Sequence, residues 1–226
     1  MNTHRKPSAR TLATRAKLVA TAENLFAEQG VASVSLNEIT RAAEQKNRNA
    51  VHYHFGDKDS LIRAIFEKHA VPIAAQRTAM INAISSSPNA TLADVIAALV
   101  KPVAARFEDE DGGLAYIKIS AQLAASNLLR YFHKQSGKED APEYWPDMAH
   151  LWGPYLEEIP LALRNHRMSL MVGMMFHGLA DHAIFRESDE PEMANTELMV
   201  NNLIDSIGAM LAAPASASTV AALNSV

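Results

Sequence analysis

Four side chains that carry rings stand in consecutive positions from His52 to Phe55, and together they could do several kinds of chemistry. The two imidazoles could bind a metal ion, act as a general acid and base, or hold an anion. Because helical positions two apart do not share a face, His52 and His54 are predicted to point in different directions. The next histidine is as far along as His69. We therefore favour an anion, with a purely structural role for His54 as the alternative.

A second candidate pair, His177 and Asp181, is spaced four residues apart and so shares one helical face, with His166 and His182 nearby. Such a pair could bind a metal or transfer a proton, but an oriented interior histidine is commoner. The sequence has no cysteine, no Ser-centred elbow, no glycine-rich phosphate loop and no His-Glu-x-x-His run. We therefore expect no catalytic residue, no metal and no cofactor. A helical enzyme that uses His177 and Asp181 is kept as an alternative.

The charges of the chain are divided unevenly along its length. Residues 1–56 contain eight Lys and Arg against four Glu, whereas the rest contains 13 Lys and Arg against 21 Asp and Glu. The net charge of −4 is therefore the sum of a basic N-terminal segment (1–56, the head) and an acidic remainder (57–226, the body). A polyanion that binds only the head would explain this division, and a solvated charge run is the alternative.

Three helices are predicted to position the ring-bearing residues. Apolar residues recur at three- and four-residue steps over 14–29, and Gly30 follows as a stop signal. The stretch Ser-Leu-Asn-Glu (35–38) is a capping box that begins a helix of about two turns. A third helix is expected around 48–54. This layout is that of a helix-turn-helix, whose last helix enters the major groove of DNA.

The third helix and the residues around it carry side chains suited to contact both the bases and the phosphates of duplex DNA. Arginine pairs well with guanine and asparagine with adenine, whereas hydroxyl and imidazole groups can reach phosphate oxygens. The residues expected to read bases are Asn47, Arg48, Asn49 and His52. The residues expected to contact phosphates are Ser35, Tyr53, His54 and Lys58. Val51 and Phe55, four residues apart, are expected to pack inward.

Over about residues 11–66 the chain resembles the N-terminal helix-turn-helix of TetR-type transcriptional regulators. The segments that carry the resemblance are TRAKLVATAENLFAEQGVASVSLNEITRAA (14–43) and VHYHFGDKDSLI (51–62). Two departures are visible: Glu44 stands where the commonest family pattern has a glycine, and the interval from Ile39 to Phe55 is one residue longer. That length resembles a subgroup whose turn reads Gly-Gln-Arg-Asn. The resemblance implies a DNA-binding regulator with an effector pocket in its body.

The rest of the chain is also predicted to be helical, so the expected fold class is all-α, with about nine helices in total. Asp57 caps a long helix towards Ile84, in which Pro72 is expected to make a kink or break. Further helices are expected over 91–107, 114–132, 146–157, 161–186 and 193–211. The predicted domains are the helix-turn-helix head with its basic arm (1–56), a larger helical effector-binding and dimerisation domain (57–212), and a disordered tail (213–226).

The last two predicted helices are the expected dimer interface. The segment MSLMVGMMFHGLA (168–180) is apolar on nearly all sides, so it must be covered on nearly all sides. Gly173 and Gly178 in this segment would allow another helix to approach closely. Apolar residues also form one stripe along the last helix. The expected interface residues are Gly173, Gly178, Val200, Ile204 and Ile207. Core packing within one chain is the alternative for part of both helices.

Aromatic and methionine side chains of the body could also line an apolar cavity. Methionine adapts to irregular ligands, and aromatic rings supply large walls. The expected pocket residues are Phe107, Tyr116, Met148, Trp152, Met171, Met175 and Phe176. Plain core packing is the alternative for each of them.

These features predict a sequence-specific DNA-binding transcriptional regulator, most simply a homodimeric repressor released by a small hydrophobic effector. Its expected partners are double-stranded DNA with a palindromic operator, a second copy of the chain, and an effector whose identity the sequence leaves open. The polar N-terminus is no secretory signal, and no apolar run reaches the length of a membrane span, so we expect a cytoplasmic protein without membrane contact. A structural helical interaction protein is the remaining alternative.

Overall fold

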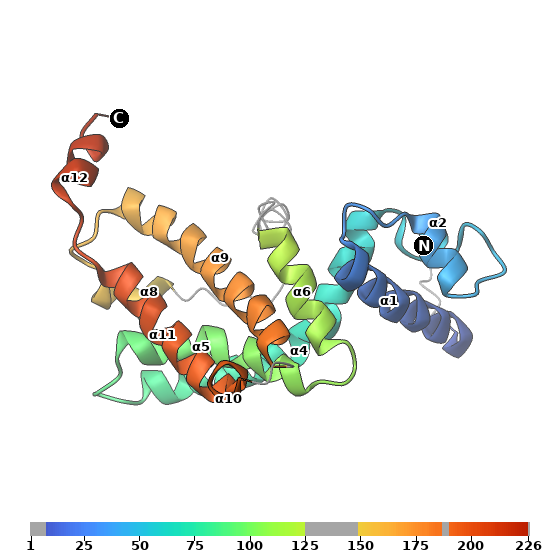
Figure 1. The fold of residues 1–226 in the computed structure, drawn as a ribbon, viewed down its shortest axis with the longest axis horizontal. Coiled ribbons are helices and arrows are strands. Elements are labelled where there is room, and N and C mark those ends of the chain that lie inside the picture. Colours follow the sequence, from blue (N-terminus) through green and yellow to red (C-terminus); the bar gives the residue numbers. More distant parts are fainter. Residues whose placement is uncertain (1–7, 125–148, 187–189, 226) are drawn as a thin grey trace, which may run out of the picture.

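The computed structural model describes residues 8–124, 149–186 and 190–225, and every regular element in these ranges is helical (Figure 1). The all-α prediction is thereby confirmed. The helices of the head are α1 (Ala9–Gln29), α2 (Leu36–Ala42) and α3 (Ala50–Phe55). The elements of the body are α4 (Lys58–Ser85), α5 (Leu92–Ala104), the 3-10 turn η1 (Ala105–Glu108), α6 (Gly113–Ala124), α8 (Ala149–Trp152), the 3-10 turn η2 (Gly153–Tyr155), α9 (Leu161–Phe185), α10 (Pro191–Ala194), α11 (Thr196–Ala212) and α12 (Ala217–Leu223).

The head is a small three-helix unit at one end of an elongated molecule (Figure 1). Leu18 and Phe26 of α1, Ile39 of α2, Val51 of α3 and Leu61 of α4 are all fully buried. The three- and four-residue spacing of the apolar residues along α1 places them on one face, against which α2 packs, while α3 packs against α2 and α4. These residues form the apolar core of the head, which is continuous with the core of the body in one cluster.

Side-chain caps determine where these helices begin, as the sequence predicted for Ser35 and Asp57. The Ser35 hydroxyl accepts a hydrogen bond from the N–H of Glu38, and the Asp57 carboxylate accepts one from the N–H of Ser60. Each cap satisfies an amide that the first helical turn leaves without a partner. At the other end of α1, Gly30 has φ 92°, a backbone conformation that favours glycine.

Helix α4 connects the head to the body, and the break expected at Pro72 is absent. The helix continues through this residue to Ser85. A proline removes one hydrogen bond of the helix and crowds the preceding turn. Pro72 is exposed, so water can solvate the carbonyl that loses its bond, while the neighbouring His69 and Ile73 are buried. Burial on either side of the proline keeps the helix in one piece.

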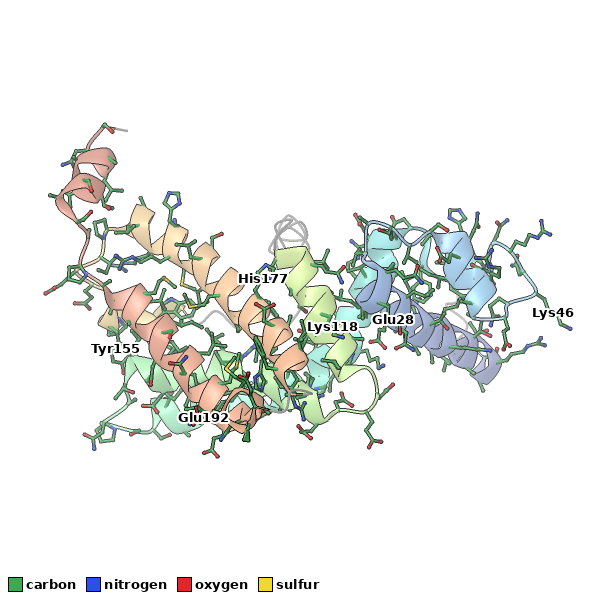
Figure 2. All side chains as sticks on the ribbon, viewed as in Figure 1. Glu28, Lys46, Lys118, Tyr155, His177 and Glu192 are labelled. Atoms are coloured by element: carbon green, nitrogen blue, oxygen red, sulfur yellow. The ribbon has the colours of Figure 1, made fainter. Side chains whose placement is uncertain are left out.

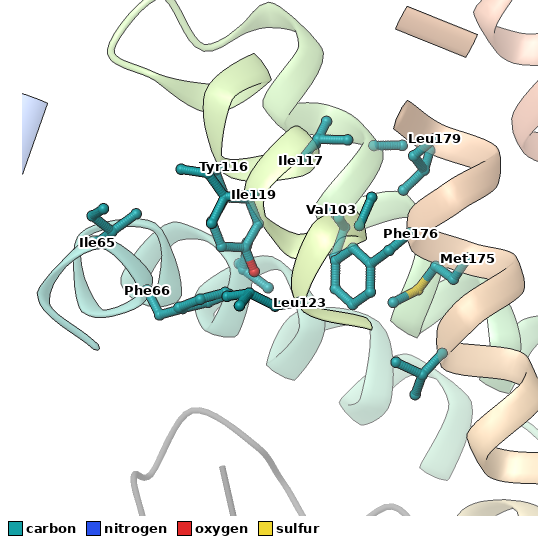
Figure 3. Close-up of a cluster of buried hydrophobic side chains, with 14 of the residues drawn as sticks. Ile65, Phe66, Val103, Tyr116, Ile117, Ile119, Leu123, Met175, Phe176 and Leu179 are labelled. Atoms are coloured by element: carbon teal, nitrogen blue, oxygen red, sulfur yellow. The ribbon is translucent and has the colours of Figure 1, made fainter. Parts of the chain in front are cut away.

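The body is built on α4, α5, α6, α9 and α11, which share one apolar core. Figure 3 shows part of this core, where α9 contributes Met175, Phe176 and Leu179. They lie beside Ile117 of α6 and Val103 of α5. Helix α6 also contacts α1, and α4 spans both parts, so head and body touch through two helices. These contacts make α6 and α4 the structural link between the two ends of the molecule.

Several element boundaries differ from the expectation, and α1 begins at Ala9 and not at residue 14. The third helix begins at Ala50 and not near Arg48, and the last predicted helix is divided into α10 and α11 at Asn195, which caps α11. The tail predicted to be disordered contains α12, because Ser216 caps a short helix in which Ala217, Ala221, Ala222 and Leu223 are good helix formers. The expected end of one helix at Phe132 lies outside the described residues.

Helix α9 is long and apolar enough to cross a membrane by length and composition alone. Its side chains argue for a core helix, since Met171, Met175 and Leu179 are buried against α6 and α11. In the same helix, the Arg167 guanidinium is buried and donates to the carbonyl of Leu211 at 2.6 Å. The helix therefore contributes to the core of the body.

Candidate nucleic-acid interface

Helix α3 presents two faces with opposite character, as the spacing of its residues predicted. Val51 and Phe55 are buried, whereas Tyr53 is 77% exposed and His52 is also exposed. Alternation of this kind leaves one side of a six-residue helix free to meet a ligand. In Figure 2, Lys46 extends from the loop that leads into α3, at the outer end of the head. The exposed side of α3 and this loop form one candidate surface.

Three of the four expected base-reading residues lie in the turn before α3 and not on the helix itself. Asn47, Arg48 and Asn49 are exposed, and Asn49 is the N-cap residue of α3. The side-chain oxygen of Asn47 accepts a hydrogen bond from the N–H of Asn49 at 3.0 Å. Local bonds of this type compete with helix formation, which explains the later helix start. The imidazole Nδ1 of His52, the fourth candidate, pairs with the carbonyl of Gly56.

The residue that departs from the family pattern, Glu44, has an unusual backbone. Its φ of 53° makes it the one non-glycine residue with positive φ among the described residues. Its carboxylate pairs with the ammonium of Lys17 on α1 at 2.8 Å, and this hydrogen bond and charge lower the pKa of Glu44. The turn of the helix-turn-helix is thereby tied to α1.

The expected phosphate-contacting residues come from the ends of three helices. Ser35 is at the start of α2, Tyr53 and His54 are at the end of α3, and Lys58 begins α4. The Lys58 ammonium lies 5.5 Å from the ring centroid of Phe26, and partial burial lowers the pKa of Lys58. The Ser35 hydroxyl already acts as a helix cap. Tyr53 and Ser35 are exposed, whereas His54 and Lys58 are partly buried, and the phosphate contacts of all four stay a prediction.

Sequence reasoning missed Arg15, which lies on α1 beneath the end of α3. Its guanidinium donates to the carbonyl of His54 at 2.8 Å and lies 4.2 Å from the ring centroid of Phe55. Burial first, and then the charge of Arg15, lower the pKa of His54. Nothing in the sequence signals a contact between residues 39 positions apart, so only the fold reveals it.

A buried polar junction connects the head to the body, and sequence reasoning missed it too. Glu23 of α1 is 1% exposed and binds His69 of α4 at 2.8 Å and Lys68 at 2.7 Å. Lys68 also binds Asp111 at 2.8 Å, and the side chain of Gln122 bonds to the backbone at the end of α1. A surface cleft of about 570 Å³ opens beside this junction.

The structure places most of the expected pocket residues in the packed core. Phe107, Tyr116, Met171, Met175 and Phe176 are all less than a tenth exposed and belong to one apolar cluster. Figure 3 shows Tyr116 beside Phe66, while Phe176 and Met175 lie further along the same cluster. Trp152 is half-buried at the edge of the cluster, and Met148 lies outside the described residues. The pocket thus stays a prediction.

The expected dimer residues divide into two groups. Val200, Ile204 and Ile207 are buried within their own chain, and a Cβ at Gly178 would approach Leu203 of α11 at 3.4 Å. A Cβ at Gly173 would meet nothing within 4 Å, so Gly173 faces outward. Of the five, Gly173 alone lies on an open side of the described structure.

The histidines and acid of α9 do not gather into a site. His166, His177 and Asp181 are exposed, and Figure 2 shows His177 on the outer side of α9. His182 is buried and its Nε2 pairs with the hydroxyl of Thr196 at 2.9 Å. Within the described residues, no three histidine, cysteine or acidic side chains are grouped so that they could hold a metal ion.

The geometry of the head defines a helix-turn-helix protein: a long helix supports two short ones, and the last presents an exposed polar side. Comparison with known families agrees, since residues 18–65 match the model for bacterial regulatory proteins of the tetR family. Over 63 residues the chain is 41% identical to the HTH-type transcriptional regulator AcrR of Shigella flexneri. The helix-turn-helix head therefore belongs to the TetR family, as its resemblance indicated.

These similarities are strongest in the head. The match to AcrR covers 28% of this chain and 29% of that relative. Over the whole length, the chain is similar to the crystal structure of a TetR-family regulator from Streptomyces coelicolor A3, with 18% identity, a TM-score of 0.44, and coverage of 92% of this chain and 98% of the other. A similarity at that level does not extend the assignment into the body.

Proposed function

We propose that this chain is a transcriptional regulator that binds a palindromic operator in duplex DNA as a homodimer, most simply as a repressor. The observation that carries the proposal is the TetR-family head. Its exposed turn and α3 belong to residues 1–56, the basic part of the chain. The AcrR relative is named as a transcriptional regulator of the helix-turn-helix type, which supports the same role here.

Selection of bound sites from a pool of random duplexes tests DNA binding directly. Enrichment of a palindrome-like sequence is expected, since a dimer reads two half-sites about 34–36 Å apart. Binding should weaken steeply as salt rises, because each neutralised phosphate releases counterions. If selection enriches no sequence, and salt-sensitive binding is absent, the chain is not a DNA-binding regulator, and the two rival functions remain: a structural protein, or an enzyme using His177 and Asp181.

The dimer surface we propose is the exposed side of α9 together with the adjoining part of α11. Large apolar residues that are exposed in the single chain lie there: Leu170 (62%), Ile184 (70%), Met174 and Leu198. On α9 these residues lie close to one helical line, and Gly173 lies beside it with open space around it. The exposed His177 and Asp181 lie on the same line, so the surface is mixed, and its apolar residues mark the part that a partner covers.

Sedimentation of point variants tests this surface. Leu170→Glu should convert the protein to monomers and weaken operator binding, because a charge would replace a desolvated apolar contact. Leu161→Glu is the matched control, since Leu161 is equally exposed on the same helix but lies on the opposite side. If Leu170→Glu stays dimeric, the interface lies elsewhere.

The effector we propose is a small, largely apolar molecule that binds the body and lowers the affinity for the operator. Helix α4 begins at Lys58, two residues after Gly56, the C-cap of α3, and it continues into the core of the body, so a shift of α4 would move the head. A coupling of about 1–3 kcal/mol is enough, and it must be reciprocal, with operator DNA weakening effector binding. A broad panel of hydrophobic metabolites that leaves operator binding unchanged would rule this out.

A further inference from the structure

Helix α3 is too short to hold its own position. It has six residues, whereas isolated helices below about 12–15 residues are marginal in water. Three buried side chains, Ala50, Val51 and Phe55, anchor its inner side to the head core. Apolar contact is not directional, so it sets the orientation of the exposed end, which carries Tyr53 and His54, less strictly than a hydrogen bond does. The end of α3 therefore needs a directional contact.

Arg15 supplies such a contact from α1. The last carbonyls of a helix have no partner within the helix, and the Arg15 guanidinium donates to one of them, that of His54, at 2.8 Å. A positive charge at this end of a helix is also favoured by the helix dipole. The same guanidinium lies over the ring of Phe55 at 4.2 Å, so its plane fixes both the backbone and the ring of neighbouring residues.

Helix α1, which carries Arg15, is firmly anchored in the head. Helix α1 has 21 residues, is capped by Ser8, and buries Leu18 and Phe26 in the head core. Two residues after Arg15, Lys17 holds Glu44 in the turn that precedes α3. Helix α1 thus contacts the turn through the exposed Lys17 pair, which adds little to stability, and the end of α3 through the partly buried Arg15.

We propose that Arg15 is a positioning residue for DNA recognition, which sets the orientation of α3 and does not itself contact DNA. The inference rests on the proposed DNA binding, because its role is to place residues that meet the duplex. Its structural part can be tested without DNA, so that failure of one proposal can be distinguished from failure of the other.

Hydrogen exchange of the full chain without DNA is the first measurement, on Arg15→Ala, Arg15→Lys and Lys17→Ala. Amides of residues 50–56 should exchange faster in Arg15→Ala, because the anchored carbonyl is released, while those of α5 and α11 should not change. Arg15→Lys keeps the charge but lacks the planar fork, so partial protection is expected. Lys17→Ala removes an equal charge from the same helix and should leave residues 50–56 as in the wild type. Equal exchange in Arg15→Ala and the wild type would overturn the proposal.

Binding to a selected operator and to a random duplex is the second measurement. Arg15→Ala should reduce the ratio of the two affinities about tenfold, the size of one lost base contact. Its salt slope should equal that of the wild type, whereas Lys58→Ala, which removes an expected phosphate contact, should lower the slope by about 0.9. A slope lowered by Arg15→Ala with the ratio intact would show that Arg15 contacts phosphate directly, against the proposal. If the wild type binds no duplex, the hydrogen exchange result still decides whether Arg15 positions α3.

Discussion

Residue 44 is held in a backbone conformation that side chains with a Cβ rarely adopt. Glu44 has φ 53°, where an L-residue crowds its own carbonyl and glycine does not. The Lys17 ion pair that accompanies it is exposed, with 50% and 81% of the two side chains accessible, and pairs of this kind add little to stability. The turn therefore keeps its shape because the surrounding head core enforces it.

Replacing Glu44 with glycine should stabilise the head. Relief of the left-handed strain outweighs the lost surface pair and the added freedom of the unfolded chain, so thermal unfolding should shift upward by a few degrees. Glu44→Ala is the control, because it removes the same ion pair and keeps the strain, and its midpoint should not rise. Thermal melts followed by circular dichroism would compare the three proteins. A glycine variant that melts below the alanine variant contradicts this argument.

The exposed residues around α3 should divide into two classes by their effect on DNA binding. Tyr53→Phe and His54→Ala should weaken binding to all duplexes alike, since phosphates carry no sequence information. Arg48→Ala should instead reduce discrimination between selected and random DNA by about 1–3 kcal/mol, as expected for a lost bidentate base contact. Titrations of both duplexes at one fixed salt concentration measure this. If all three variants lose the same factor on both duplexes, Arg48 does not read a base.

Tyr116 should make the protein sensitive to alkali. Its burial raises its pKa to about 12, while in the unfolded chain it has the ordinary value of about 10. The unfolded state therefore loses this proton first, so stability is fully present below pH 10 and falls as the pH rises from 10 to 12. The loss attributable to Tyr116 is about 2–3 kcal/mol at most. Urea unfolding at pH 8 and pH 11 should show a smaller decline for Tyr116→Phe than for the wild type.

At the scale of helices, local signals and tertiary contacts account for different parts of the structure. Caps at Ser35 and Asp57, and the inward side of α3, could be predicted because they depend on residues within four positions. The contacts of Arg15 with His54 and of Glu23 with His69 join residues 39 and 46 positions apart, and no local pattern encodes them. Helix α3 begins later than the sequence pattern predicts, because the side chain of Asn47 accepts a hydrogen bond from the N–H of Asn49 within the turn.

Pro72 is the clearest case in which packing overrides a local signal. The helix passes through it unbroken, although a proline in a helix interior is unfavourable by about 3 kcal/mol relative to alanine. Pro72→Ala should therefore stabilise the protein, by about 1–2 kcal/mol once the greater freedom of the unfolded alanine chain is counted. Urea unfolding would measure this. Val71→Ala, at the exposed neighbouring position, is the control and should change stability little. An unstable Pro72→Ala variant would mean that the proline shapes α4 in a way that packing requires.

On the scale of the whole molecule, a few polar contacts join the head to the body. Helix α1 meets α6, where Gln122 bonds to the backbone of Phe26 and Val31, and Glu23 meets Lys68 and His69. Buried charges that lose a partner are costly, so this junction has a strong preference for its present arrangement. A movement of the head relative to the body must therefore either keep Glu23 paired with Lys68 and His69 or break these buried contacts.

Glu23→Gln should therefore loosen the head from the body. We expect a loss of about 1–3 kcal/mol, less than the 3–5 kcal/mol of a fully buried pair, because Lys68 is partly exposed and keeps Asp111. Hydrogen exchange should quicken in α1 and in the adjoining part of α4, while α9 and α11 keep their protection, since they lie in the far part of the body core. Asp111→Asn is the matched control: it removes the other acid on Lys68, but that carboxylate is 79% exposed, so little change is expected. If the two variants lose equal stability, or if protection falls throughout the body, the junction is not a separate contact between head and body, and α1 is instead part of one cooperative core.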